Sequence, residues 1–141
     1  MKIQHNLENK SGKKKLILVI DDERGYRDFY GYMLEPFGYE VHSAEDGKKG
    51  LEMALQNEYE AIFLDVHMPG LKGPDVLKMI KQAKPRQIVI IFSSSSDPSF
   101  SFEKKARDMG AFDCLYKPVE VDDILKVLRK ALGVNGNGKQ N

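Results

Sequence analysis

The chain has 141 residues, with 22 Lys and Arg against 21 Asp and Glu, so its formal net charge is +1. This near balance gives no electrostatic reason to expect binding to nucleic acid or to an acidic membrane surface. The single cysteine, Cys114, excludes an internal disulfide framework and is typical of a reducing compartment, so we expect a cytoplasmic protein. No apolar run approaches the ~18 residues of a membrane span, and residues 1–15 lack the apolar centre of a signal peptide.

The two ends of the chain differ in composition from its middle. Residues 1–14 are polar and carry four lysines against one glutamate, which predicts a flexible basic arm. Contact of this arm with an acidic partner is the alternative to a simply solvated tail. Residues 134–141 are rich in Gly and Asn and predict a disordered C-terminal tail. One folded domain is therefore expected over residues 15–133.

Taken in chain order, apolar runs alternate with amphipathic segments. The runs predict strands at residues 15–20, 39–43, 61–64, 88–92 and 112–116. A helix is predicted after each strand. The helices comprise an aromatic-rich segment from Tyr26 to Phe37, residues 46–56, a segment from Gly73 to Pro85, one that ends at Gly110 and one after Pro118. Five strands that each precede a helix predict an α/β fold with a parallel sheet, right-handed crossovers and helices on both faces.

Acidic residues follow two of the predicted strands. Asp21 and Asp22 come directly after the first strand, and Asp65 follows the third. The carboxyl ends of parallel strands meet at the edge where α/β proteins bind ligands, so we expect these side chains to lie together. Crowded carboxylates need a cation, and an oxygen-only ligand set favours Mg²⁺. For Asp65 alone, a turn or helix-cap aspartate is the structural alternative.

The fourth and fifth strands add a hydroxyl and an ammonium to the same edge. Ser93 follows the fourth strand, and Lys117 follows the fifth. With Mg²⁺ present, Asp65 could attack a phosphoryl group and form an aspartyl phosphate. Lys117 would pair first with the carboxylate and then with a phosphate oxygen, while Ser93 would donate a hydrogen bond to another oxygen. The structural alternative for Lys117 is an ordinary surface charge.

These motifs, in this order and spacing, resemble the receiver domains of two-component response regulators over about residues 14–133. The matching segments are Val19-Ile20-Asp21-Asp22, Leu64 to Pro69 with Gly73 beyond it, the apolar strand before Ser93, Met109-Gly110-Ala111 and Tyr116-Lys117-Pro118.

The resemblance implies a flavodoxin-like three-layer fold with five strands in the order 2-1-3-4-5 and five helices. It implies that Asp65 is the phosphoacceptor, that Asp22 binds Mg²⁺ directly and that Asp21 binds it through water. The backbone carbonyl of His67 would be a further metal ligand. A cis peptide bond before Pro118 is also implied.

The implied function is that of a stand-alone response regulator. It would accept a phosphoryl group from a histidine kinase or a histidine phosphotransfer protein, and then relay it or switch conformation to control a partner. It would be a phosphoacceptor signalling domain and not an enzyme, beyond catalysing its own phosphorylation and dephosphorylation. Its readout surface would lie on the fourth helix, the fifth strand and the fifth helix.

The chain departs from the family pattern at two positions. The segment between Ser93 and Lys117 is about two residues longer than usual, so Ser94 or Ser95 could supply the phosphate-binding hydroxyl instead of Ser93. Cys114 stands three residues before Lys117, where the family usually carries Tyr or Phe as a conformational switch. Cys114 is interpreted as a small buried side chain rather than a reactive thiol.

Three other functions are weighed against the receiver. A receiver-like protein-binding module would keep the fold but would not be phosphorylated. An aspartyl-phosphate phosphohydrolase needs a second acid two residues after the nucleophile, where this chain has His67. A flavin-binding protein needs a phosphate-cradling loop after the first strand, where this chain has acids.

Overall fold

The structure is a computed structural model, and it describes residues 15–67, 72–94 and 100–133, with the backbone alone for residues 94 and 100–102. The arm and tail predicted at residues 1–14 and 134–141 lie outside the described residues. None of the described helices is long and apolar enough to cross a membrane.

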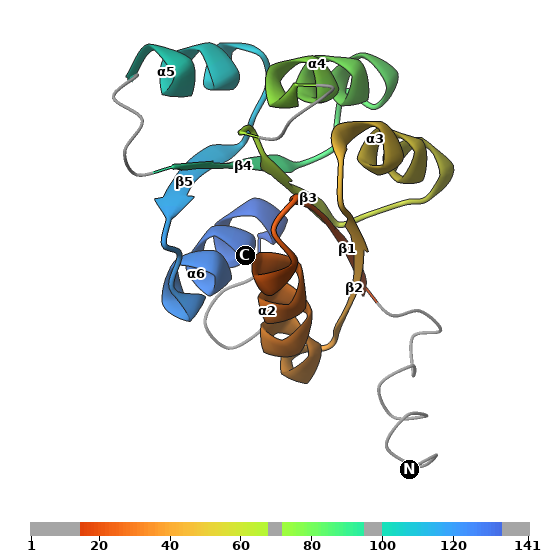
Figure 1. The fold of residues 1–141 in the computed structure, drawn as a ribbon, viewed down its shortest axis with the longest axis vertical. Helices are drawn as coiled ribbons and strands as arrows, with labels where there is room; N and C mark the ends of the chain where they lie inside the picture. The colour runs from red at the N-terminus through yellow and green to blue at the C-terminus, as the bar shows by residue number, and fades with distance from the viewer. Residues whose placement is uncertain (1–14, 68–71, 95–99, 134–141) are drawn as a thin grey trace.

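Five parallel strands form one sheet in the order β2-β1-β3-β4-β5 (Figure 1). The strands are β1 (Lys15–Ile20), β2 (Tyr39–Ala44), β3 (Ala61–Asp65), β4 (Val89–Ser94) and β5 (Asp113–Lys117). All five residues of the central strand β3 are buried. A strand covered on both faces has no polar side to alternate with, which explains its continuous apolar sequence.

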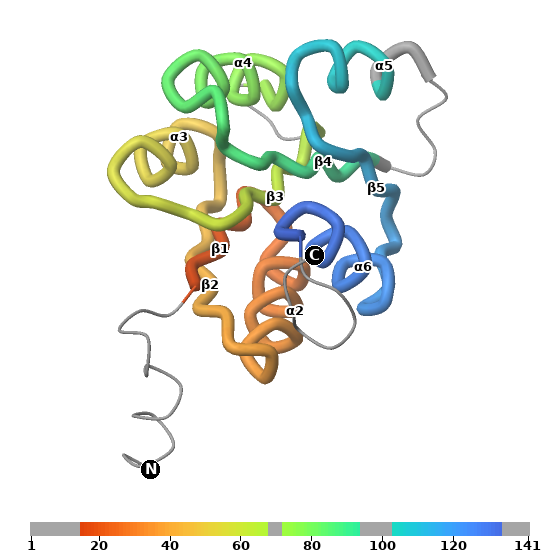
Figure 2. Tube along the Cα trace, turned by 180° about the vertical axis from the view of Figure 1, so that it is seen from behind, coloured from red at the N-terminus to blue at the C-terminus, as the bar shows by residue number. Residues whose placement is uncertain are grey.

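Helices cover both faces of the sheet. The described helices are α2 (Arg24–Leu34), the 3₁₀ helix η1 (Glu35–Phe37), α3 (Gly47–Gln56), α4 (Gly73–Ala83), α5 (Phe100–Asp108) and α6 (Val121–Leu132). Figures 1 and 2 show α2 and α6 on one face and α3, α4 and α5 on the other. The predicted three-layer fold and strand order are confirmed.

Each face of the sheet has its own apolar core. Under α2 and α6, the rings of Tyr30, Phe63 and Phe92 stack with centroids 5.1 to 5.8 Å apart. Leu64 and Ile91 belong to the core under α3, α4 and α5. Because successive strand residues face opposite cores, both faces are packed up to the strand ends. The side chains that follow those ends are therefore carried on a rigid base.

The structure differs from the predicted elements at two places that matter for local geometry. The first helix ends at Leu34 and continues as the 3₁₀ helix, because Pro36 has no N–H with which to extend an α-helix. Phe37, the last aromatic residue of the segment predicted as the first helix, is 58% exposed. Strand β4 extends to Ser94, two residues past its predicted end, with Ser93 opposite Tyr116 and Ser94 opposite Lys117.

Candidate functional site

The predicted site residues gather at the carboxyl edge of the sheet. Asp21 and Asp22 follow β1, Asp65 is the last residue of β3, and Lys117 is the last residue of β5. Asp22, Asp65 and Lys117 line a pocket of about 520 Å³. The parallel topology thus brings residues 21 and 117, far apart in sequence, into contact.

Lys117 is the electrostatic centre of this pocket. Its Nζ lies 2.9 Å from Asp21 Oδ2, 3.0 Å from Glu23 Oε1 and 3.3 Å from Asp65 Oδ2. It also lies 4.2 Å from the centroid of the Tyr26 ring, within the range of a cation–π contact. Burial disfavours the ammonium, but the hydrogen bonds that it donates to Asp21 and Glu23, together with the negative charges of Asp21 and Asp65, outweigh burial and raise the pKa of Lys117. Lys117 therefore stays charged at neutral pH.

Glu23 and Tyr26 belong to this site although the sequence interpretation gave them no role in it. Glu23 is the N-cap residue of α2, and Tyr26 lies in the first turn of that helix. The first turn of α2 therefore places both side chains against the lysine. The acidic run Asp21-Asp22-Glu23 was the one sequence signal that could have identified Glu23.

Asp21, Asp22 and Asp65 each offer a carboxylate oxygen, and these oxygens lie within 4.8 Å of one another. Asp21 is fully buried and Asp65 nearly so, while Asp22 is exposed. Burial raises the pKa of Asp21 to about 6, against the lowering effect of a hydrogen bond from the Glu23 N–H. The His67 N–H likewise donates to Asp65 Oδ1 at 2.9 Å. Three convergent carboxylates with no sulfur or imidazole ligand among them fit a hard divalent cation such as Mg²⁺.

Ser93 is buried in β4, and its hydroxyl contacts an imidazole. His67 Nε2 lies 3.1 Å from Ser93 Oγ. The sequence interpretation assigned only the carbonyl of His67 to the site and missed its ring, because no local pattern links positions 67 and 93. The alternatives Ser94, as a side chain, and Ser95 lie outside the described residues.

Two further expectations concern the strand that carries the lysine. The Lys117–Pro118 peptide bond is cis, as the resemblance implied. Cys114 is buried, and burial raises the pKa of its thiol to about 11, so the interpretation as an inert buried side chain is supported. The hydroxyl of Tyr116 donates to Glu103 of α5.

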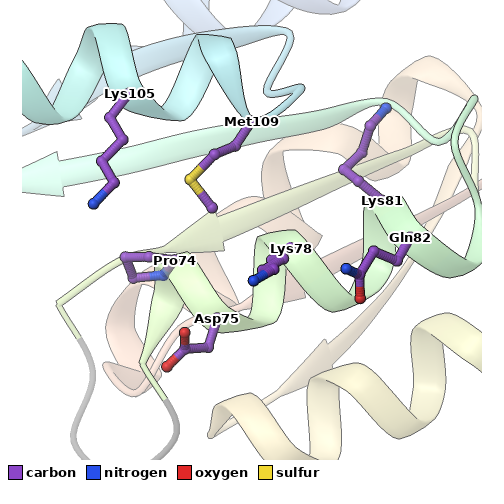
Figure 3. A pocket seen from close by; sticks show the side chains of 7 residues that line it. All are labelled: Pro74, Asp75, Lys78, Lys81, Gln82, Lys105 and Met109. Atoms are coloured by element: carbon purple, nitrogen blue, oxygen red, sulfur yellow. The ribbon is translucent and has the colours of Figure 1, made fainter.

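A second pocket of similar size has different chemistry. It has a volume of about 510 Å³ and lies between α4 and α5 (Figure 3). Its charged lining residues are Asp75 and three lysines, Lys78, Lys81 and Lys105. Lys81 Nζ donates to the carbonyls of Pro85 and Gln87, and Figure 3 shows its side chain turned away from Asp75. This pocket lacks the combination of clustered carboxylates and lysine found at the strand ends.

Comparison with known proteins gives a consistent result. A family model described as the response regulator receiver domain matches residues 17–129. Response regulator ArlR of Staphylococcus saprophyticus is 35% identical over 117 residues, which are 82% of this chain and 51% of that protein. This chain spans about half the length of the curated relatives it matches.

Solved structures agree with the sequence relatives. A receiver domain protein from Clostridium thermocellum superposes with a TM-score of 0.77 at 33% identity, covering 84% of this chain and 94% of that one. A response regulator from Burkholderia pseudomallei, solved with a phosphorylated aspartic acid and a calcium ion, gives a TM-score of 0.74 at 27% identity, covering 81% and 66%. The chain therefore belongs to the response regulator receiver domain family.

Proposed function

We propose that this receiver domain accepts a phosphoryl group on Asp65 from the phosphohistidine of a histidine kinase or a histidine phosphotransfer protein. The observation that carries the proposal is the Lys117 ammonium, held 3.3 Å from Asp65 Oδ2 among three acidic side chains. An exposed surface lysine would not be held in this way. The aspartyl phosphate would then change the conformation that a partner protein recognises or pass the phosphoryl group on.

In the transfer step, a carboxylate oxygen of Asp65 attacks phosphorus. A P–O bond forms as the P–N bond of the phosphohistidine breaks, and the departing imidazole nitrogen keeps the bonding electrons and takes up a proton from solvent. Lys117 holds the nucleophile in place and then pairs with a phosphate oxygen as a fixed positive charge. Ser93 is proposed to donate its hydroxyl to another phosphate oxygen.

The carboxylates of Asp21, Asp22 and Asp65, with the backbone carbonyl of His67, are proposed to hold Mg²⁺, Asp21 doing so through water. The bound ion would offset the negative charge that accumulates on the phosphoryl oxygens during transfer. The crowding of the three carboxylates supports this assignment, because their oxygens lie within 4.8 Å of one another and the single ammonium of Lys117 leaves a net negative charge there.

Phosphorylation would replace one negative charge on Asp65 with a group near −2 that has three acceptor oxygens. A minor conformation in which Ser93 has moved toward these oxygens would gain population. The readout is proposed to involve α5, β5 and α6, where Arg107 bridges Glu103 and Asp113 at 3.0 and 2.8 Å. Movement of β4 could reach this surface through its pairing with β5.

The stand-alone form and the cytoplasmic location expected from the sequence remain part of the proposal. The curated relatives are about twice as long as the matched region, so the size of the native protein tests whether it is a stand-alone receiver. An immunoblot of fractionated source cells measures both the size and the compartment. A cytosolic band at the mass of this chain supports the proposal, and a longer or membrane-bound product contradicts it.

The phosphoacceptor assignment is tested by incubating the protein with acetyl phosphate and Mg²⁺ and measuring the intact mass. We expect a gain of one phosphoryl group that is stable in acid, labile in base and abolished by a chelator. Asp65→Asn should remove the gain. Asp28→Asn is the matched control, because Asp28 is exposed on α2 and paired with Arg24.

Unchanged labelling of Asp65→Asn would contradict the site assignment. Absence of labelling in the wild-type protein under all Mg²⁺ conditions would favour the alternative, a receiver-like module that binds its partner without phosphorylation.

A further inference from the structure

The His67 side chain occupies a defined position beside the hydroxyl that is proposed to bind phosphate. Its Nε2 lies 3.1 Å from Ser93 Oγ. Its backbone is fixed at the same time, because its N–H donates to Asp65 Oδ1 at 2.9 Å. The ring is thus anchored to the nucleophile through the main chain and contacts the hydroxyl through its tip.

We propose that His67 is a positioning residue that holds the Ser93 hydroxyl in its resting place and so opposes the switch to the phosphorylated conformation. The proposal rests on the proposed function, since it requires that Ser93 moves to a phosphoryl oxygen. Ser93 is 2% exposed, so its hydroxyl depends on protein partners, whereas His67 is exposed and can replace a lost contact with water. Breaking the contact therefore removes one hydrogen bond that stabilises the resting position of the Ser93 hydroxyl, and a hydrogen bond to a phosphoryl oxygen would replace it.

The position of the ring makes this contact an element of control rather than of the fold. His67 and Lys117 line the same pocket, but Lys117 contacts the carboxylates whereas the His67 ring contacts the hydroxyl. Removing the ring leaves the backbone carbonyl and N–H of residue 67 in place. His67→Ala therefore removes the contact with Ser93 and keeps the backbone carbonyl that is proposed to bind the metal.

The test measures the affinity for beryllofluoride in saturating Mg²⁺ by calorimetry, since this anion mimics a phosphoryl group on a carboxylate. We expect His67→Ala to bind it about fivefold more tightly, the equivalent of one ordinary hydrogen bond removed from the resting state. Ser93→Ala should abolish this gain, so His67→Ala in the Ser93→Ala background should have no further effect. Ser93→Thr, which retains a hydroxyl, should preserve the gain.

A matched control variant and an NMR measurement distinguish loss of the His67–Ser93 contact from a general destabilisation of the fold. His42 also contacts a hydroxyl, with Nδ1 2.9 Å from the Tyr59 oxygen, but it lies on β2 away from the site. His42→Ala should leave beryllofluoride affinity unchanged. In the unliganded protein, Ser93→Ala should shift the ¹⁵N resonance of His67 Nε2 and leave the His42 ring resonances in place.

The two contrary outcomes are distinct. Weaker binding by His67→Ala in both the wild-type and the Ser93→Ala backgrounds would mean that the ring contacts the phosphoryl group itself. Unchanged binding, or an equal gain in both backgrounds, would mean that the ring does not act through Ser93. Either result contradicts the proposal that His67 holds the Ser93 hydroxyl in its resting place. Failure of the proposed function would instead appear as an absence of Mg²⁺-dependent beryllofluoride binding in the wild-type protein.

Discussion

Replacing Lys117 by methionine removes the positive charge of the site while keeping a side chain of similar length. In the structure the ammonium contacts Asp21, Glu23 and Asp65, and its side chain is 13% exposed. Without it, three carboxylates face one another with no counter-ion among the residues that the structure describes. We therefore expect Lys117→Met to destabilise the fold when no divalent cation is present.

The magnitude follows from the burial of each partner. Asp21 and Asp65 have side chains that are 0% and 5% exposed, and breaking a buried pair by removing one partner costs about 3–5 kcal/mol. Glu23 is 56% exposed, so its contact adds at most about 1 kcal/mol. We expect the free energy of unfolding to fall by about 3 kcal/mol. Saturating Mg²⁺ should recover most of this loss, since a ligand at 100 times its dissociation constant stabilises by about 2.7 kcal/mol.

The assay is urea unfolding at neutral pH, followed by circular dichroism, in chelator and in Mg²⁺. Lys104→Met is the matched control, because Lys104 pairs with Asp108 on the surface of α5 with side chains 80% and 67% exposed. This control should change stability by less than about 1 kcal/mol in either buffer. A Lys117→Met variant that behaves like the control, or whose stability does not depend on Mg²⁺, would refute the reasoning.

Substitutions at Tyr30 and at two glycines, and the reactivity of Cys114, give further predictions. The buried hydroxyl of Tyr30 has no hydrogen-bond partner among the described residues, so Tyr30→Phe should stabilise the fold by about 1 kcal/mol in urea unfolding; a loss of that size would reveal a partner. A Cβ on Gly73 would lie 2.4 Å from Val66 Cα, so Gly73→Ala should lower the free energy of unfolding by about 2 kcal/mol. A Cβ on Gly31 of α2 would meet no described atom within 4 Å, so Gly31→Ala should raise the free energy of unfolding by about 0.5–1 kcal/mol. The same urea unfolding assay measures both glycine variants, and equal changes in their stability would contradict the close contact of Gly73 with Val66. Burial raises the pKa of Cys114 from 9.0 to about 11, which lowers its thiolate fraction roughly 100-fold, so iodoacetamide at mildly alkaline pH should alkylate the native protein at least that much more slowly than the unfolded one.

The fold could be predicted from the sequence because its signals are local and repeated. The central strand is covered on both faces and has no polar alternation, and the amphipathic segments between strands show helical spacing. Parallel topology then sends every strand end to one edge. That rule alone placed Asp21, Asp65 and Lys117 together without knowledge of any side-chain contact.

The remaining features of the site depend on side-chain geometry. Glu23 reaches Lys117 because the first turn of α2 starts beside the strand end, and the contact of His67 with Ser93 spans 26 positions of sequence. No period or spacing encodes such contacts. Strand β4 was predicted too short because the apolar run ends at Phe92, yet pairing with β5 carries the strand to Ser94.

The central claim is that Asp65, among the acids and the lysine at the sheet edge, accepts the phosphoryl group. Its most direct measurement is to label the protein with acetyl phosphate and Mg²⁺, reduce it with borohydride, which converts an aspartyl phosphate to homoserine, and sequence the peptides by mass spectrometry. We predict homoserine at position 65 and at no other aspartate. Homoserine at another position, or none in a protein that has gained a phosphoryl group, would contradict the account.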